Sequence, residues 1–192
     1  MPIEITEVFY PTVRAEWRAW LETHHQSKPE IWLQRYKKAT GKPCITYDEL
    51  VEECLCFGWV DSIVKKYDDE SNVQRITPRR QKSFLSELNR QRVWKLQELG
   101  LMTHAGLAPI EDQVGSPDDP LEIPDWVEMQ LKEDPVAWEN FQDFSHFYKR
   151  LKIGWIKECG PRRMEEAQRR LNYLLKMTAQ GKMYGTRPME DL

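Results

Sequence analysis

Hydrophobic residues near the start of the chain follow two different periods. After Pro11 they recur at helical spacing, which predicts an amphipathic helix. Its apolar positions are Val13, Trp17, Trp20 and Leu21. His24 and His25 lie at its expected end, where a cation stabilises the helix C-terminus, so capping is favoured over metal binding. The stretch 30–38, EIWLQRYKK, is short and rich in β-formers, which predicts a strand.

A second helix is predicted from a capping box at Thr46 and Glu49, in which each side chain satisfies a free backbone N–H group. Gly58 stands where such a helix commonly ends. The apolar positions between them are Tyr47, Leu50, Val51, Cys54 and Leu55. Cys54 and Cys56 would point about 200° apart on this helix, so they cannot chelate one metal or form a disulfide. Cys54 is therefore expected in the core, while the role of Cys56 stays open.

From Trp59 the pattern alternates, which predicts a strand with Trp59, Asp61 and Lys65 on one face. The polar stretch 68–72, DDESN, predicts a turn, and residues 73–78 predict a second strand. We expect these two strands to pair with each other as a β-hairpin.

The register of this hairpin decides which charges meet. A turn centred on Glu70 would place Lys65 opposite Arg75, and Asp61 opposite Arg79. An Asp-Arg pair satisfies itself, whereas two adjacent cations need an anion between them. The hairpin therefore predicts either a structural ion pair or part of an anion site.

After Pro78, the segment 83–100, SFLSELNRQRVWKLQELG, predicts a helix with Ser83 as its N-cap. The expected inward positions are Leu85, Leu88, Val93, Leu96 and Leu99. Asn89 lies beside this stripe, and a buried amide has to be hydrogen-bonded. We therefore expect Asn89 to tie this helix to backbone elsewhere.

The rest of the chain is expected to be helical. A short helix begins near Thr103, and the Pro-rich segment 116–124, which follows Gly115, predicts a linker. Further helices are expected over 125–133, 135–144, 145–159 and 162–180. Their expected core residues are Trp126, Trp138, Phe141, Phe144, Tyr148, Trp155, Leu171 and Leu174. The pattern predicts an α+β fold in which N-terminal helices pack on a small antiparallel sheet (1–115), followed by a C-terminal helical bundle (125–192).

Composition narrows the class of protein. The 192 residues are 40% hydrophobic and 31% charged, with a net charge of −3, which predicts a globular protein without general attraction to nucleic acid. The four cysteines are irregularly spaced, which favours reduced thiols over disulfides. Neither a secretory signal pattern nor a stretch of membrane-spanning length is present, so we expect a cytoplasmic location without membrane insertion.

The charges are unevenly distributed. Residues 75–95 hold seven basic residues against one acid, and residues 111–143 hold eleven acids against Lys132. One interpretation is solvated helix faces that attract one another. The other is an anion site, because Arg79 and Arg80 precede an expected helix start, where free N–H groups and the helix dipole favour negative charge.

Motifs for cofactor or metal chemistry are absent. The sequence has no Gly-rich phosphate loop, His-Glu-x-x-His, Cys-x-x-Cys or nucleophile elbow. We therefore predict no cofactor and no metal. Catalytic residues stay unknown: an enzyme would need a perturbed acid or thiol, for which Asp61 and Cys56 are the candidates.

In three stretches, residues 46–62, 74–107 and 155–182, the chain resembles the YdeI/OmpD-associated proteins, also called bacteriocin-protection proteins. The most specific parts of the resemblance are CFGWVD and TPRR. The positions that match the signature are Gly58, Trp59, Asp61, Lys65, Arg75, Thr77, Pro78, Arg79, Arg80, Ser83 and Asn89. Two departures are Leu85, where the family has tryptophan, and EEAQ at 165–168, where it has Glu-Thr-Arg.

The resemblance implies a bacterial protein with a role in stress resistance or in defence against antimicrobial peptides, and it transfers no catalytic residue. Contact with an outer-membrane porin is not expected from a chain without a signal or anchor. Our leading hypothesis is a non-enzymatic binder of an unknown small anionic ligand or a protein partner. The expected ligand-binding residues are Trp59, Asp61, Lys65, Arg75, Arg79, Arg80, Ser83 and Asn89.

Three alternatives stay open. Asp61 and Arg79 could serve only to hold the hairpin to the following helix. The protein could instead be an enzyme acting on a small phosphorylated or carboxylated metabolite. Nucleic-acid binding is the third, and the acidic segment 111–143 counts against it.

Overall fold

The computed structural model describes residues 3–185, which form two compact units. The first unit comprises the residues up to 85 together with 89–117, and the second comprises 86–88 and the residues from 118 onward. The first unit combines helices with a sheet, and the second is helical. The α+β class expected from the sequence is therefore confirmed, while the expected domain limits stay a prediction.

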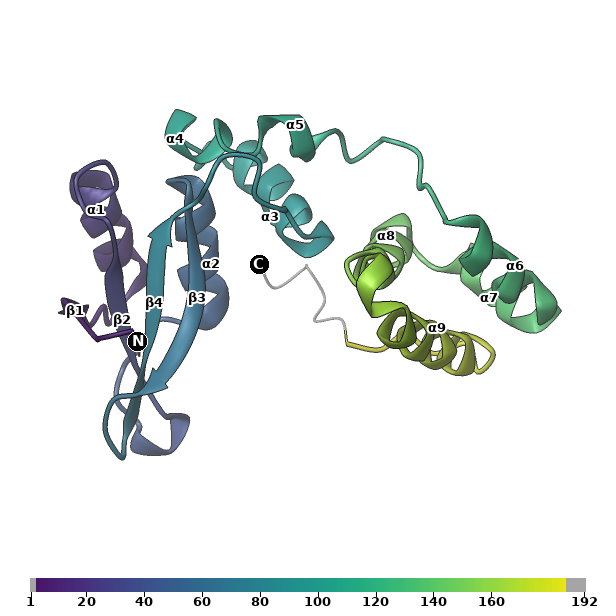
Figure 1. Ribbon diagram of the computed structural model, residues 1–192, viewed down its shortest axis with the longest axis horizontal. Coiled ribbons are helices and arrows are strands. Elements are labelled where there is room, and N and C mark those ends of the chain that lie inside the picture. Colours follow the sequence, from purple (N-terminus) through teal and green to yellow (C-terminus); the bar gives the residue numbers. More distant parts are fainter. Residues whose placement is uncertain (1–2, 186–192) are drawn as a thin grey trace. The chain divides into compact units, whose positions relative to one another are not determined.

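Within residues 3–185, the sheet has four strands in the order β1-β2-β4-β3 (Figure 1). They are β1 (Val8–Phe9), β2 (Ile31–Tyr36), β3 (Trp59–Lys66) and β4 (Ser71–Pro78). The pairs β2·β4 and β4·β3 are antiparallel, but β1 runs parallel to β2. The sheet is therefore mixed and not purely antiparallel as expected, because the short strand β1 carries no periodic pattern of its own.

Two helices, α1 (Arg14–His24) and α2 (Tyr47–Cys56), pack against one face of this sheet. Trp17 of α1 is fully buried, and its Nε1 donates a hydrogen bond to the backbone oxygen of Leu50 in α2 at 3.3 Å. The same buried cluster contains sheet residues Ile31, Leu33, Trp59 and Ile76. The first unit therefore has one core between its helices and its sheet.

The expected start of α2 and the expected end of α1 are confirmed. Thr46 Oγ1 accepts a hydrogen bond from Glu49 N at 3.2 Å, and Glu49 Oε2 accepts one from Thr46 N at 2.7 Å. His25 caps α1, and its Nδ1 lies 2.8 Å from the oxygen of Leu21. Tyr47, expected in the core stripe, is 46% exposed because it occupies the first turn of α2 beyond the core.

Gly58 allows the chain to turn sharply from α2 into β3. Its φ is +71°, and a Cβ atom there would lie 2.2 Å from the backbone oxygen of Ala105 in α4 (His104–Leu107). Gly106 approaches α2 as closely, since a Cβ there would lie 2.3 Å from the oxygen of Cys56. Thr103 caps α4, as expected, and its Oγ1 donates to the same Cys56 oxygen at 2.6 Å. The stretch CFGW is thus a helix-to-strand junction.

The hairpin register differs from the expected one. Lys65 pairs with Val73 and not with Arg75, and Asp61 pairs with Ile76 and not with Arg79. Asp68 closes the turn by accepting hydrogen bonds from the N–H groups of two following residues, so β4 begins at Ser71. The register also shifts between Asp61 and Val64. An earlier turn and an irregular strand together displace every pairing predicted from Glu70.

The helix expected from Ser83 begins later, as α3 (Glu87–Glu98). Gln113 of α5 (Glu111–Val114) explains the difference: its Oε1 accepts from Leu85 N at 2.8 Å, and its Nε2 donates to Ser83 O at 2.9 Å. These backbone groups therefore find partners without helical hydrogen bonds. Val93 and Leu96 are buried as expected, and so is Leu85, although it is not helical. The other two expected inward positions are wrong, since Leu88 and Leu99 are exposed.

The second unit contains α6 (Asp125–Glu133), α7 (Pro135–Asp143), α8 (His146–Lys157) and α9 (Met164–Thr178), close to the expected ranges (Figure 1). Side chains of Asp134 and Ser145 cap α7 and α8. The expected core residues Phe141, Tyr148, Leu171 and Leu174 are buried, and Trp126, Trp138 and Phe144 pack against them. Trp155 lies outside this cluster.

Candidate functional site

Trp59 is a core residue. Its side chain is 1% exposed, its Nε1 donates to the backbone oxygen of His25 at 3.1 Å, and its ring packs edge-on against Trp20. The ring therefore holds β3 against the end of α1. The structure leaves Trp59 little surface with which to contact a ligand.

Asp61 lies two residues after Trp59 on β3, and its carboxylate accepts hydrogen bonds from two side chains. Its Oδ2 accepts from Tyr47 Oη at 3.0 Å and from Gln74 Nε2 at 2.6 Å. Burial and the neighbouring Asp61 carboxylate raise the pKa of Tyr47 to about 12, so its hydroxyl keeps its proton at neutral pH. The sequence placed neither Tyr47 nor Gln74 at the site.

Lys65 and Arg75 lie on the other face of the sheet. Arg75 follows the alternation of β4, so it points away from the face shared by Asp61 and Ile76. Arg75 forms an ion pair with Glu30, whose other oxygen accepts from Thr6 at 2.6 Å. Lys65 Nζ donates to the backbone oxygen of Ile3 and lies 5.4 Å from the ring of Trp32. Both cations therefore have partners of their own, away from Asp61.

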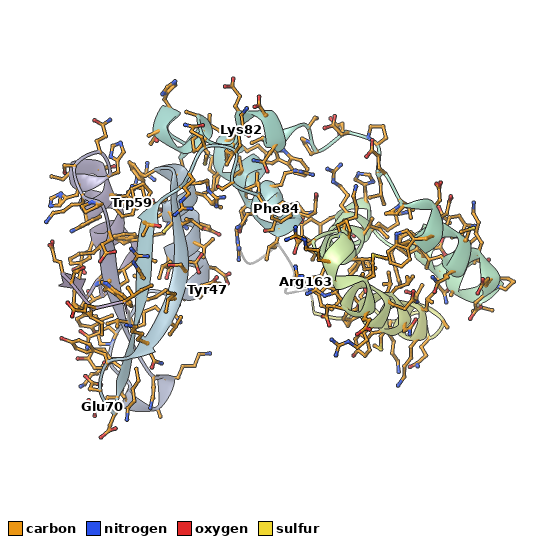
Figure 2. The ribbon with its side chains drawn as sticks, in the orientation of Figure 1. Tyr47, Trp59, Glu70, Lys82, Phe84 and Arg163 are labelled. Carbon is orange, nitrogen blue, oxygen red and sulfur yellow. The ribbon has the colours of Figure 1, made fainter. Side chains whose placement is uncertain are left out.

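Arg79, Arg80 and Ser83 belong to the irregular segment between β4 and α3, with Lys82 and Phe84 (Figure 2). Arg79 Nη1 lies 3.4 Å from Ser83 Oγ and 3.3 Å from the backbone oxygen of Phe84. Lys82 has a φ of +59°, an uncommon value for a residue with a side chain. The expected anion site at a helix N-terminus is not formed, because α3 begins only at Glu87.

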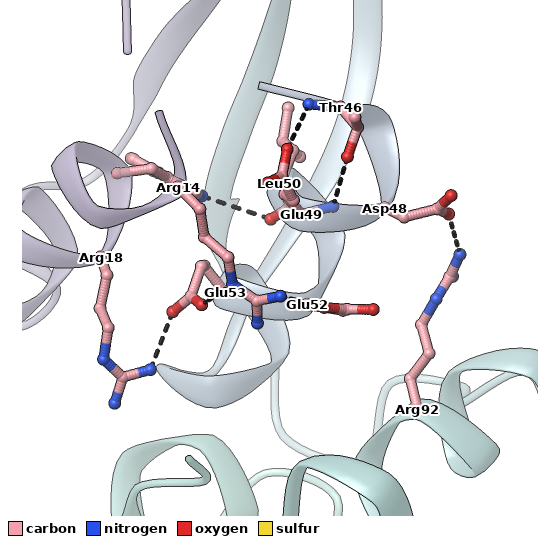
Figure 3. A network of polar contacts seen from close by, with 10 residues as sticks. Arg14, Arg18, Thr46, Asp48, Glu49, Leu50, Glu52, Glu53 and Arg92 are labelled. Atoms are coloured by element: carbon pink, nitrogen blue, oxygen red, sulfur yellow. Dashed lines mark hydrogen bonds and ion pairs between the residues drawn. The ribbon is translucent and has the colours of Figure 1, made fainter. Parts of the chain in front are cut away.

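Asn89 accepts a hydrogen bond at its Oδ1 from Arg92 Nη1 at 2.8 Å. Arg92 in turn forms a 2.5 Å ion pair with Asp48 in the first turn of α2 (Figure 3). Asn89 therefore orients a side chain that ties α3 to α2.

Arg79 differs in its electrostatics from the ion-paired arginines of the first unit, Arg14, Arg18, Arg75 and Arg92. Across residues 3–185, no carboxylate oxygen lies within 4.0 Å of its guanidinium nitrogens, although the side chain is half-buried. Burial lowers the pKa of Arg79, while Cys54 and Asp61 act in the opposite direction. Its positive charge is therefore removed from water without an ion-pair partner.

A second arginine, Arg35, is similar. It follows Ile31 and Leu33 on the helix-facing side of β2, and its guanidinium lies 5.5 Å from the ring centre of Tyr47. In the described part of the chain, its Nη1 is buried without a hydrogen-bond partner, and Arg35 forms no ion pair. The alternation IWLQR could have identified it, because Arg35 continues the apolar face.

We name the "Asp61 cluster" for Asp61 and the four side chains that meet it directly, through Tyr47, or through the field of its charge: Arg35, Tyr47, Gln74 and Arg79. Of the eight expected ligand-binding residues, it includes Asp61 and Arg79. The hydroxyl of Ser83 accepts a hydrogen bond from Arg79, and Arg80 is exposed.

The thiols next to this cluster are not activated. Burial raises the pKa of Cys54 well above its ordinary value, and burial with the nearby Glu53 raises that of Cys56 to about 11. Both are therefore thiols at neutral pH. Within the described ranges, no group of three or more His, Cys, Asp or Glu residues is placed to hold a metal ion.

A second charged network joins α1 to α2 (Figure 3). Arg14 contacts Glu52 and Glu53 at 2.5 Å each, and Arg18 contacts Glu53 at 2.9 Å. The carboxylate side chain of Glu53 is 1% exposed. Each of these charges has an opposite charge beside it, which is typical of a structural network.

Comparison with known proteins assigns the two parts of the chain to different families. Residues 9–109 match a family described as a domain of unknown function, DUF8412. Residues 120–181 match the family described as bacteriocin-protection, YdeI or OmpD-associated. CFGWVD and TPRR, which had been the most specific parts of the resemblance, thus lie in the region of the first family, and the tail lies in that of the second.

No curated protein and no solved structure matches the chain. No helix within residues 3–185 is long and apolar enough to span a membrane. The match to residues 9–109 extends over more than half of the 192 residues. The chain therefore belongs to the DUF8412 family, and it carries a bacteriocin-protection, YdeI or OmpD-associated domain over residues 120–181.

Proposed function

We propose that the first unit binds a small anionic ligand at the Asp61 cluster, and that the protein acts without catalysis in resistance to bacteriocins or related stress. The observation that carries this proposal is the charge of Arg79, which is half-buried and has no carboxylate partner among the described residues. A bound anion would supply the missing charge and form charge-assisted hydrogen bonds.

The surroundings of Arg79 favour a ligand with both acceptor and donor groups. Tyr47 and Gln74 both donate to Asp61, which holds the carboxylate in place. The guanidinium of Arg35 lies 5.5 Å from the ring centre of Tyr47, whose hydroxyl donates to Asp61. A phosphorylated or carboxylated metabolite fits this arrangement, since its anionic group would face an arginine and a hydroxyl could bond to Asp61.

Binding is favoured over catalysis because the site lacks an activated group. The thiols of Cys54 and Cys56 are protonated at neutral pH, and the hydroxyl of Tyr47 has a raised pKa. None of these groups is a ready nucleophile or base near pH 7. The bacteriocin-protection domain over residues 120–181 supports a role in resistance.

The test is a thermal-shift screen of the purified protein with inorganic phosphate, citrate, AMP and a short oligonucleotide, with sodium chloride at equal ionic strength as control. A ligand at about 100 times its dissociation constant adds roughly 2.7 kcal/mol of stability. We expect Arg79→Ala to abolish the shift and the neighbouring Arg80→Ala to preserve it, because Arg80 is exposed.

Loss of the shift in both variants would indicate general charge attraction and not this site. A shift confined to the oligonucleotide that falls steeply with salt would point to nucleic-acid binding. No shift with any anion would refute the anion site. Survival of cells that express the wild type or Arg79→Ala, when exposed to a bacteriocin, then tests whether the site serves resistance.

A further inference from the structure

Phe84 lies in the irregular segment between β4 and α3, and its side chain is directed to solvent (Figure 2). At 66% it is the most exposed large hydrophobic residue among those that the structure describes. The next residue, Leu85, is 1% exposed and belongs to the core of the first unit. A single exposed apolar side chain is common in soluble proteins. The neighbours of Phe84 therefore decide whether it indicates a site.

Hydrogen bonds fix the backbone on both sides of Phe84. Gln113 Nε2 donates to Ser83 O at 2.9 Å, and Gln113 Oε1 accepts from Leu85 N at 2.8 Å. Ser83 N also donates to the backbone oxygen of Arg80 at 3.1 Å, which closes a turn. The Phe84 side chain is thus carried by a backbone that is already ordered, so a ligand would lose little affinity to ordering this segment.

The same segment contains the unbalanced charge of Arg79. Arg79 Nη1 donates to the backbone oxygen of Phe84 at 3.3 Å. The side chain of Phe84 branches from the Cα next to this carbonyl group, so the guanidinium and the ring are neighbours. Arg80 and Lys82 are exposed, and neither has an ion-pair partner within residues 3–185. Uncompensated positive charge and an accessible aromatic ring therefore meet in residues 79–84.

We propose that the anion bound at the Asp61 cluster is a nucleotide, with its phosphate group at Arg79 and its base stacked on the ring of Phe84. This inference rests on the proposed function and narrows the class of its ligand. The phosphate oxygens accept charge-assisted hydrogen bonds from the guanidinium, and every base offers a flat face to an aromatic ring. The ribose supplies hydroxyl groups from which the Asp61 carboxylate can accept a hydrogen bond.

The charges around the segment favour a free nucleotide over a nucleic-acid strand. A strand is held by cations that follow its backbone over several nucleotides. Here the cations are confined to one short segment, and Glu111 and Asp112 precede the Gln113 that holds it. Both of these acids are exposed, so they would repel further phosphate groups.

The test is isothermal titration calorimetry of the full chain with AMP, ribose 5-phosphate and inorganic phosphate at equal ionic strength. AMP and ribose 5-phosphate both carry a phosphorylated ribose, and AMP adds the base, so the ratio of their dissociation constants measures the contribution of the base. We expect AMP to bind about tenfold more tightly, because of stacking. UMP is expected between the two, since its base has a smaller face.

Two results separate this inference from the proposed function. Equal dissociation constants for AMP and ribose 5-phosphate, with binding of both lost in Arg79→Ala, would overturn the nucleotide and leave the anion site intact. No binding of any of the three ligands would overturn both. A single-stranded oligonucleotide without terminal phosphates that binds more tightly than AMP would overturn the free nucleotide in favour of a strand.

Variants of Phe84 test the ring itself. Phe84→Leu keeps an apolar side chain without a flat face, so we expect about tenfold weaker binding of AMP and unchanged binding of ribose 5-phosphate. Phe84→Tyr keeps the ring and should bind AMP as the wild type does. Tyr67→Leu is the matched control, because Tyr67 is 47% exposed and follows β3 at the end opposite to Arg79. Equal AMP affinities in Phe84→Leu and Tyr67→Leu would overturn the role of Phe84.

Discussion

Two groups of arginines in the first unit differ in how their charge is balanced. Arg14 and Arg18 lie between carboxylates, with Glu53 almost fully buried between them. Arg35 and Arg79, in the Asp61 cluster, form no ion pair within the described residues. The same side chain is therefore part of the scaffold in one place and a candidate for binding in the other. The difference indicates that an unbalanced charge is a better sign of function than the presence of arginine.

The largest loss of stability is expected from Glu53→Gln. Glu53 pairs with two arginines and is 1% exposed, so its loss leaves partly buried cations without a partner. We expect the free energy of unfolding to fall by about 3 kcal/mol in urea denaturation. Glu22→Gln is the matched control, because Glu22 pairs with the same Arg18 but is 56% exposed. A loss below about 1 kcal/mol there is expected, and equal losses in the two variants would contradict a structural role specific to the buried network.

The next largest effect is expected from Lys152→Met, which removes a buried cation that contacts aromatic rings and not carboxylates. Lys152 lies on α8, is 5% exposed, and its Nζ lies 3.9 Å from the ring centre of Tyr184. In the folded protein its pKa is about 8 and in the unfolded chain about 10.5, so the unfolded state binds more protons between these values. Burial of Lys152 therefore lowers the free energy of unfolding most below pH 8, and this penalty disappears as the pH rises to 10.5. We expect Lys152→Met to be more stable than the wild type by about 2 kcal/mol at pH 7.

The measurement is denaturant unfolding of both proteins at pH 7 and pH 10.5, where the difference should shrink. Burial raises the pKa of both Tyr148 and Tyr184, and both side chains are present in the two proteins, so their effects largely cancel in the difference. Lys157→Met serves as the control and should show no such change with pH. A constant difference between the two pH values would rule out a depressed pKa at Lys152.

A smaller loss of stability is expected from Glu30→Gln, which removes the ion pair between Glu30 and Arg75. The Thr6 hydroxyl and then Arg75 lower the pKa of Glu30 below 4.5, so its stabilising contribution is present above that pH and is lost as pH falls through the folded value. Glu30→Gln should cost about 1 kcal/mol at pH 7. In acid titrations followed by circular dichroism, the variant and the wild type should converge. A difference that persists at pH 2 would show that the contact does not depend on charge.

The smallest effect on stability is expected from Arg79→Met without ligand. Because Arg79 has no ion-pair partner among the described residues, its replacement by an apolar side chain should change the free energy of unfolding by less than about 0.5 kcal/mol, or increase it. Thermal unfolding without added anions measures this. A loss as large as that of Glu53→Gln would move Arg79 to the structural class and weaken the proposed anion site.

Local hydrogen bonding made much of the fold predictable. The capping box at Thr46 set the start of α2, and the helices of the second unit lie close to the ranges expected from the sequence. The start of α3 could not be predicted in this way. The N–H of Leu85 and the oxygen of Ser83 bond to Gln113, which is distant in sequence, and this satisfies the groups that a helix would otherwise have used.

The candidate site was predicted less well than the fold. Asp61 and Arg79 were expected, but their expected pairing assumed a regular hairpin, and the register shift between Asp61 and Val64 changed it. Tyr47, Gln74 and Arg35 come from three different elements, and nothing local to any of them indicates that they meet.

The sequence by itself determined the class of fold, the start of α2 and most of the hydrophobic faces, because these depend on caps, turns and periodicity within a few residues. The tertiary structure alone decided which charges are neutralised. Arg75 forms an ion pair with Glu30, and Arg92 forms one with Asp48, although the partners are more than forty residues apart in the sequence. Arg79 has no carboxylate partner among the described residues. Charge pairing depends on distance in space and on exclusion of water, and a sequence pattern contains neither.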